Sequence, residues 1–194
     1  MSALKSLIDE IRACRECESS LPLGPRPILA VNNDSKILII GQAPGIRVHQ
    51  SGIPWNDASG VRLRSWLGVT DSEFYDTSNF ALVPIGFCYP GTGKGGDLPP
   101  RPECATLWHR SLLKQLDQVR LTLLVGRYAQ ETILANSRKA SLTETVKAWR
   151  GYKPKHLPLP HPSPRNNRWL KSNPWFTREV VPWLQRRVKQ VLSK

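Results

Sequence analysis

Acidic residues are scarce in this chain of 194 residues, because 15 Asp and Glu stand against 28 Lys and Arg. The formal net charge is therefore +13 at neutral pH. An excess of this size disfavours a cationic substrate and indicates a polyanionic partner. Nucleic acid is the first expectation and an acidic membrane surface the second, and charge alone does not separate them.

The sequence also lacks dense cysteines and long apolar stretches. Its four cysteines are too few for a disulfide scaffold. No apolar run reaches the roughly 18 residues of a membrane span. The first residues mix Lys5, Asp9 and Glu10 into a helical pattern, without the apolar core of a signal peptide. We therefore expect a soluble, cytoplasmic protein with no membrane partner, folded as a single domain over residues 1–194.

Short apolar runs alternate with helical patterns along the chain. Buried strands are predicted at residues 36–40, 80–83, 121–125 and 157–159. Helices are predicted at residues 2–13, 60–67, 103–116, 127–135, 142–149 and 176–192. This alternation predicts a three-layer α/β/α sandwich around a central four-stranded parallel sheet. Loops at the carboxyl ends of such strands form the binding crevice, which here gives the loops 41–59, 84–104 and 160–170.

The cysteines form a C-x2-C pair followed by two widely spaced thiols, at Cys14, Cys17, Cys88 and Cys104. Together they can supply four sulfur ligands to one metal centre. Their spacing does not separate Zn²⁺ from an iron–sulfur cluster, and four unrelated buried cysteines are the alternative. A redox pair at the first two positions is less favoured, because that motif opens a helix and this pair ends one.

Two glycine-rich segments are candidates for ligand-binding loops. Gly41-Gln42-Ala43-Pro44-Gly45 follows the first strand directly, and glycines there let backbone N–H groups approach a ligand. The segment lacks the G-x-G-x-x-G pattern of a dinucleotide site. Residues 91–95 lack the pattern of a phosphate-binding P-loop, and a flexible basic loop is the better interpretation.

The loop after the last strand begins with His161 and continues into a basic segment. A histidine at the carboxyl end of a strand can donate a hydrogen bond to a leaving group that becomes negative. A loop histidine without a catalytic role is the alternative. Arg165, Arg168 and Lys171 surround Trp169, which predicts a surface that binds phosphate and stacks on bases.

Three segments together resemble the uracil-DNA glycosylase superfamily. They are residues 41–45, the Gly52-x-Pro54-Trp55 segment, and His161-Pro162-Ser163. The sequence looks closest to the iron–sulfur branch, whose first motif reads Gly-Glu-Ala-Pro-Gly. That branch has cysteines placed as the four are here, which implies a [4Fe–4S] cluster, although zinc accepts the same four thiolates.

The resemblance implies a role for each matching residue. Gly41 and the backbone of Gln42, Ala43 and Gly45 would line a pocket for a base swung out of damaged DNA. The ring of Trp55 would stack on that base. His161 would stabilise the departing base anion. The remaining implied contacts are to DNA and come from Ser163, Arg165, Arg168, Lys171 and Lys94. The expected activity is that of a monomeric, monofunctional glycosylase that removes uracil or a related deaminated base.

The sequence departs from the family at three places. Arg47, Val48 and His49 stand where the iron–sulfur branch has acidic residues, Ala43 stands where other branches have a water-activating Asp, and Pro84 replaces a uracil-reading Asn. His49 and Asp57 are the candidates to activate water instead, and a solvated loop residue without a catalytic role is the alternative for each. An inactive or weakly active DNA-binding member is the alternative, and a hydrolase of RNA or nucleotides ranks third.

Overall fold

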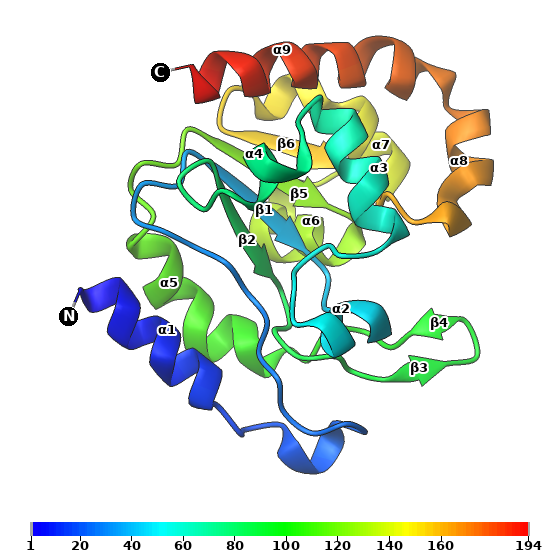
Figure 1. The fold of residues 1–194 in the computed structure, drawn as a ribbon. Coiled ribbons are helices and arrows are strands. Elements are labelled where there is room, and N and C mark those ends of the chain that lie inside the picture. The colour runs from blue at the N-terminus through cyan, green and yellow to red at the C-terminus, as the bar shows by residue number, and fades with distance from the viewer. Residues whose placement is uncertain (1, 194) are drawn as a thin grey trace.

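A central sheet of four parallel strands organises the computed structural model, which describes residues 2–193 (Figure 1). The strands are β1 Ile37–Gly41, β2 Phe80–Pro84, β5 Leu121–Val125 and β6 His156–Leu159, in the spatial order β2-β1-β5-β6. Every neighbouring pair is parallel. The predicted α/β/α fold with its four-stranded parallel sheet is confirmed, and each strand agrees with its predicted bounds to within one residue.

Side chains of β1 alternate between two hydrophobic cores, one on each face of the sheet. Ile37 and Ile39 belong to the first core, and Leu38 and Ile40 belong to the second. All four are buried. Full burial of such a side chain contributes about 1.5–3 kcal/mol. Because both faces are covered, the strand is apolar throughout rather than alternating with polar residues.

Helices cover each face of the sheet (Figure 1). The first core is closed by α3 Ala58–Leu67, α4 Asp71–Tyr75, α7 Leu142–Lys147 and α9 Val181–Leu192. The second core is closed by α1 Ala3–Ala13, α5 Arg110–Lys114 and α6 Arg127–Leu134. Within residues 2–193, no helix combines the length and apolar character needed to cross a membrane.

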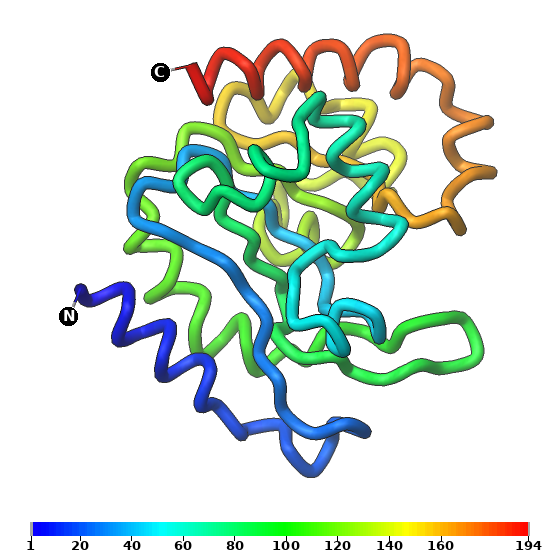
Figure 2. The backbone as a smooth tube through the Cα atoms, viewed as in Figure 1, coloured from blue at the N-terminus to red at the C-terminus, as the bar shows by residue number. Residues whose placement is uncertain are grey.

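The outer edge of β2 is covered by the chain between α1 and β1, which runs along it as an extended segment (Figure 2). Ala30 and Leu82 exchange two backbone hydrogen bonds, of 2.7 and 3.1 Å. The Ile28 N–H also donates to the Phe87 carbonyl at 2.8 Å. This pairing protects an edge that would otherwise be open to another strand.

Short elements lie in the segments predicted as loops, so those predictions were wrong in part. The loop after β1 contains α2 Ile46–Ser51, and residues 92–97 form a hairpin of β3 Thr92–Gly93 and β4 Gly96–Asp97. The basic segment after β6 folds as α8 Asn167–Ser172. Elements of two to six residues are too short to produce a periodic pattern of apolar residues.

Candidate active site

A cavity of about 560 Å³ opens at the carboxyl edge of the sheet. Its walls come from the loop after β1, the β3–β4 hairpin and the loop after β6. The lining includes Gly41, Gln42, Ala43, Gly45, Trp55, Asp57, Pro84, Asp97, His161, Ser163, Arg165 and Asn166. The structure thus brings the predicted base-binding residues together with His161. This is the edge at which parallel sheets bind their ligands.

The loop after β1 is fastened to the segment that follows β2. The Gly41 carbonyl accepts from the Ile85 N–H and the Gln42 carbonyl accepts from the Gly86 N–H, each at 3.0 Å. These bonds continue the parallel pairing beyond the ends of both strands. The floor of the cavity is therefore an extension of the sheet, which gives it the rigidity of the scaffold.

Trp55 is held against this floor by its backbone and by two glycines. Its φ is +58°, in the left-handed region that bulky residues rarely adopt. A Cβ atom on Gly41 would lie 2.8 Å from Cζ2 of the indole, and one on Gly60 would lie 1.7 Å from the Trp55 carbonyl oxygen. Both positions therefore require glycine, and together they fix the indole at the wall of the cavity.

The His161 ring is fixed in one tautomer by a short local contact. The Ser163 N–H donates to Nδ1 at 3.2 Å, so in the neutral ring the proton resides on Nε2. The Asn166 amide donates to the His161 carbonyl at 2.7 Å. Burial lowers the pKa of His161, and the charges of Asp57 and Asp97 oppose that shift only in part. At neutral pH the cavity therefore holds a neutral imidazole that can donate from Nε2.

Two carboxylates share the cavity with His161. Asp57 is the N-cap of α3, where Oδ1 accepts from the Gly60 N–H at 2.8 Å. Asp97 lies on β4 and was not identified from the sequence. A Cβ atom on Gly45 would be 3.2 Å from Oδ2 of Asp97, so the hairpin places this carboxylate against the loop after β1. The only signal for it was the glycine-rich turn at Lys94 and Gly95.

Arg165 connects the hairpin to the loop after β6. Its Nη1 donates to the Gly95 carbonyl at 2.9 Å. Gly96 has a φ of +121°, and a Cβ atom there would lie 1.6 Å from the same Nη1. The guanidinium thus occupies space that only glycine leaves free. This contact joins two walls of the cavity that are 70 residues apart in the chain.

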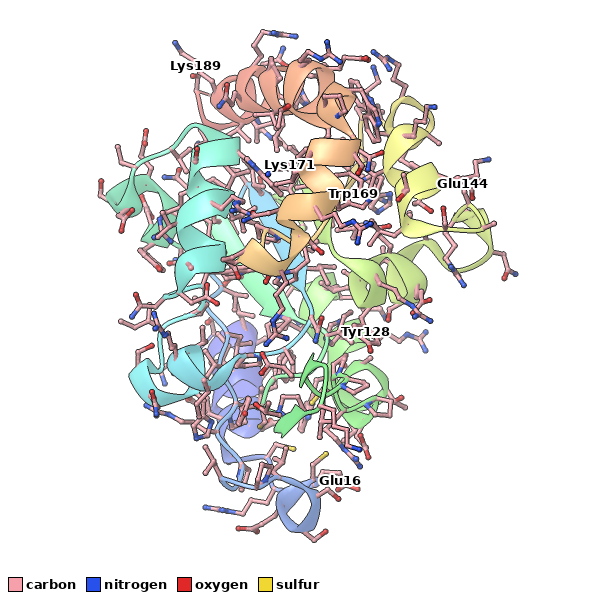
Figure 3. The ribbon with its side chains drawn as sticks, turned by 90° about the vertical axis from the view of Figure 1, so that its right-hand side faces the viewer. Glu16, Tyr128, Glu144, Trp169, Lys171 and Lys189 are labelled. Carbon is pink, nitrogen blue, oxygen red and sulfur yellow. The ribbon has the colours of Figure 1, made fainter. Side chains whose placement is uncertain are left out.

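Arg168 and Lys171 are exposed on α8 and do not line the cavity. Figure 3 labels Lys171 and Trp169 on this helix. The predicted stacking role of Trp169 is wrong, because its ring is packed inward. The indole N–H donates to the Thr143 hydroxyl at 2.8 Å, and the ring meets Phe176 edge-on at 5.7 Å. Only the basic part of that predicted surface remains available to a phosphate.

His49 is not brought into the cavity, which corrects its prediction as a catalytic residue. It lies on the buried side of α2, 8% exposed, with its ring 5.9 Å from that of Tyr89. Its carbonyl accepts from the Arg26 guanidinium. Burial and the Arg26 charge lower the pKa of the His49 ring. A helix at residues 46–51 turns this side chain inward, whereas a loop would have left it free.

Comparison with known proteins decides the family. The sequence model of the Uracil DNA glycosylase superfamily matches residues 30–185, which is most of the chain. The chain belongs to the uracil DNA glycosylase superfamily. Among solved structures, it is similar to the solution NMR structure of a candidate uracil DNA glycosylase from Methanosarcina acetivorans. That alignment has a TM-score of 0.46 and 17% identity, and covers 83% of this chain and 98% of the other.

The four cysteines of this uracil DNA glycosylase superfamily member line a second, smaller cavity. All four are free thiols, and Cys88 and Cys104 are buried. The Phe87 N–H donates to the Cys104 sulfur at 3.5 Å. Trp108 lines the same cavity, and its buried indole N–H has no acceptor among the described residues. The four predicted ligands thus line one small cavity, together with two N–H donors, of Phe87 and Trp108.

Proposed function

We propose that this chain is a monomeric, monofunctional DNA glycosylase that hydrolyses the N-glycosidic bond of uracil or a related deaminated base. The observation that carries the proposal is the neutral His161, held with its Nε2 proton free in a cavity with an aromatic wall. An enzyme of this class must take the target base out of the stack, at a cost of a few kcal/mol. A net charge of +13 favours the DNA that carries the base.

The extruded base would lie between the indole of Trp55 and the backbone of Gln42, Ala43 and Gly45. Stacking of a base on an aromatic side chain contributes about 1–3 kcal/mol. Because the Trp55 backbone is fixed by the glycines beneath it, that surface is already in place before the base arrives. Preorganisation of this kind reduces the entropy lost on binding.

His161 would act as the base departs. As the C1′–N bond breaks, its electron pair moves onto the base, and negative charge develops on a base oxygen. The neutral ring donates Nε2–H to that oxygen in a site sheltered from water. Loss of one such donor slows comparable reactions by about 10²–10³-fold.

A carboxylate would stabilise the positive sugar and accept a proton from the water that adds to C1′. Ala43 cannot do so, and His49 lies outside the cavity. Asp57 and Asp97 are the acids that share the cavity with His161. Oδ1 of Asp57 caps α3, so its Oδ2 and the exposed carboxylate of Asp97 are available to accept the proton. Asp57→Asn and Asp97→Asn, each compared with the wild type, identify which of them acts.

A DNA-binding member without strong catalysis is the second candidate. Pro84 lines the cavity in place of the Asn that reads uracil in the iron–sulfur branch, and a proline has no side-chain amide to recognise a base edge. Binding of undamaged and damaged DNA with equal affinity, and with no abasic product, would favour this candidate.

We also propose that Cys14, Cys17, Cys88 and Cys104 hold a [4Fe–4S] cluster, with Zn²⁺ as the alternative. The cysteines line one cavity with the donors of Phe87 and Trp108, and hydrogen bonds to sulfur are typical around clusters. Within residues 2–193, no three His, Cys, Asp or Glu side chains gather closely enough to ligate a single ion. Free thiols fit the reducing cytoplasm, where we place the protein.

The proposed activity is tested with a panel of oligonucleotides, each carrying one uracil, hypoxanthine or xanthine, single-stranded or paired. We expect an abasic product from at least one of them, formed about 10²–10³-fold more slowly by His161→Ala. If anaerobically purified protein leaves every substrate intact, the glycosylase proposal fails. Iron and sulfide analysis of the same preparation tests the cluster, and a colourless protein with one zinc would refute it.

A further inference from the structure

A second basic site lies at the end of the sheet opposite the cavity. It is a groove of about 700 Å³ between α9 and the segment that precedes β6. We call it the basic groove, and its charged residues are Arg150, Lys153, Arg186 and Arg187. The first two residues precede the start of β6, whereas His161 follows its end, so the strand separates the two sites. Figure 1 shows α9 along one end of the molecule, and α2 with the β3–β4 hairpin at the other.

Aromatic rings hold two of these cations in place. The Lys153 ammonium lies 5.0 Å from the ring centre of Trp149 and 5.4 Å from that of Trp183. The Arg150 guanidinium lies 4.5 Å from the Trp149 ring centre. The two indoles pack together with their centroids 5.0 Å apart. A cation–π contact positions a charge without neutralising it.

The charge of the groove is largely uncompensated. No acidic residue lines it. Arg150 pairs with Glu179 at 3.0 Å, and among residues 2–193 none of the other three cations has a carboxylate within 4.0 Å. Arg187 donates from Nη1 to Gln190 at 2.8 Å, while its buried Nε–H has no acceptor among the described residues. A cluster of positive charges costs free energy through mutual repulsion unless an anion binds there.

We propose that the basic groove binds the phosphate backbone of a nucleic-acid segment other than the one at the cavity. Guanidinium groups match phosphate oxygens with two parallel hydrogen bonds, and the two arginines on α9 are adjacent in the chain. Trp183, Arg186, Arg187 and Gln190 of the lining follow one another along α9, and a volume of about 700 Å³ exceeds what one small anion needs. This site does not depend on glycosylase activity.

The test neutralises the groove and measures the salt dependence of binding. The variant carries Lys153→Gln, Arg186→Gln and Arg187→Gln, and the ligands are undamaged single-stranded and duplex oligonucleotides followed by fluorescence anisotropy. Log K falls as log salt rises. Each lost phosphate contact makes this negative slope less steep, by about 0.7 for single strands and about 0.9 for duplex. For three lost contacts, we expect the slope to become less steep by about 2 if the groove prefers single strands, or by about 2.7 if it prefers duplex. The oligonucleotide whose salt slope changes, single-stranded or duplex, identifies the form of nucleic acid that the groove binds.

The matched control removes the same charge from exposed positions elsewhere, with Lys114→Gln, Arg120→Gln and Lys139→Gln. We expect its slopes to stay near those of the wild type. Equal decreases in both variants would show that only net charge acts and would overturn the proposal. Displacement of the oligonucleotide by an acidic peptide at a lower concentration than by unlabelled oligonucleotide would also overturn it, in favour of a protein ligand. Arg186→Gln alone, at an exposed position, repeats the test if the triple variant unfolds.

Discussion

The Ser163 N–H determines whether His161 can act as a donor, and one substitution can remove it without changing the imidazole. Ser163 has a φ of −55°, close to the value that proline imposes. Ser163→Pro therefore preserves the backbone direction while deleting the N–H that donates to Nδ1 at 3.2 Å. Ser163→Ala is the control, because it keeps the N–H and removes only the hydroxyl that accepts from the Arg165 N–H.

The expected loss follows from the strength of that bond. A neutral hydrogen bond contributes about 0.5–1.5 kcal/mol, which corresponds to about 2- to 10-fold in the ratio of the Nε2–H to the Nδ1–H tautomer. The rate follows the fraction of rings in the Nε2–H form, so Ser163→Pro should slow the excision step by at most that factor. His161→Ala, which removes the donor altogether, should slow it by about 10²–10³-fold. Ser163→Ala should excise at the wild-type rate.

The assay is single-turnover excision on the best substrate of the panel, so that product release does not mask chemistry. Imidazole ¹⁵N shifts provide a reading that does not depend on activity, because they report which nitrogen carries the proton. The wild type should show a protonated Nε2 and a bare Nδ1. A wild-type ring protonated at Nδ1, or an unchanged rate in His161→Ala, would refute the assigned role.

Three further predictions concern stability and the cysteine site. Gly96→Ala should destabilise the protein by about 1–3 kcal/mol, because φ is +121° and Arg165 occupies the Cβ position. Gly95→Ala is the control, because a Cβ atom at Gly95 would have no atom within 4 Å. Equal thermal stability of the two variants would contradict the contact between Arg165 and the hairpin. Burial lowers the pKa of His49, His109, His156 and His161. The unfolded chain therefore takes up protons first as pH falls below about 6.5. Stability should be flat above that value and decline below it toward the lowered folded pKa values, as urea denaturation measures; a constant free energy of unfolding between pH 7.5 and 5.5 would contradict this. Cys88→Ser should abolish bound iron and the visible absorbance of the cluster, while iron content equal to that of the wild type would exclude Cys88 as a ligand.

The sheet could be predicted from the sequence because each of its strands is a short, mostly apolar run. Residues 121–125 are an example, since all five are buried and the strand matches its prediction at both ends. The short elements could not be predicted, because α2 has six residues and each strand of the hairpin has two. Their stability comes from contacts with distant segments, such as the bond from Arg165 to Gly95, which no local window contains.

The same limit explains which site residues were found. His161 and residues 41–45 were identified because they stand directly after strands and match a family motif. Asp97 carries no motif, and it joins the cavity only through the hairpin and Gly45. The predicted catalytic role of His49 is wrong because of the local structure. Its segment was expected to be a loop, and the helix at residues 46–51 buries Val48 and His49 while leaving Arg47 exposed.

The two carboxylates at the cavity are the charges that fit least with a protein built to bind polyanions. Under the proposed function, Asp57 and Asp97 place negative charge where the phosphates of DNA would approach, and this repulsion would weaken the binding of any DNA. The basic residues nearby, with Arg165 at the cavity and Arg168 and Lys171 on α8, can offset that repulsion at the phosphates. These basic residues would not stabilise a positively charged sugar, whereas the two carboxylates would. A cavity that pairs acids with a neutral His161 donor therefore suits a reaction in which positive charge on the sugar and negative charge on the base develop together.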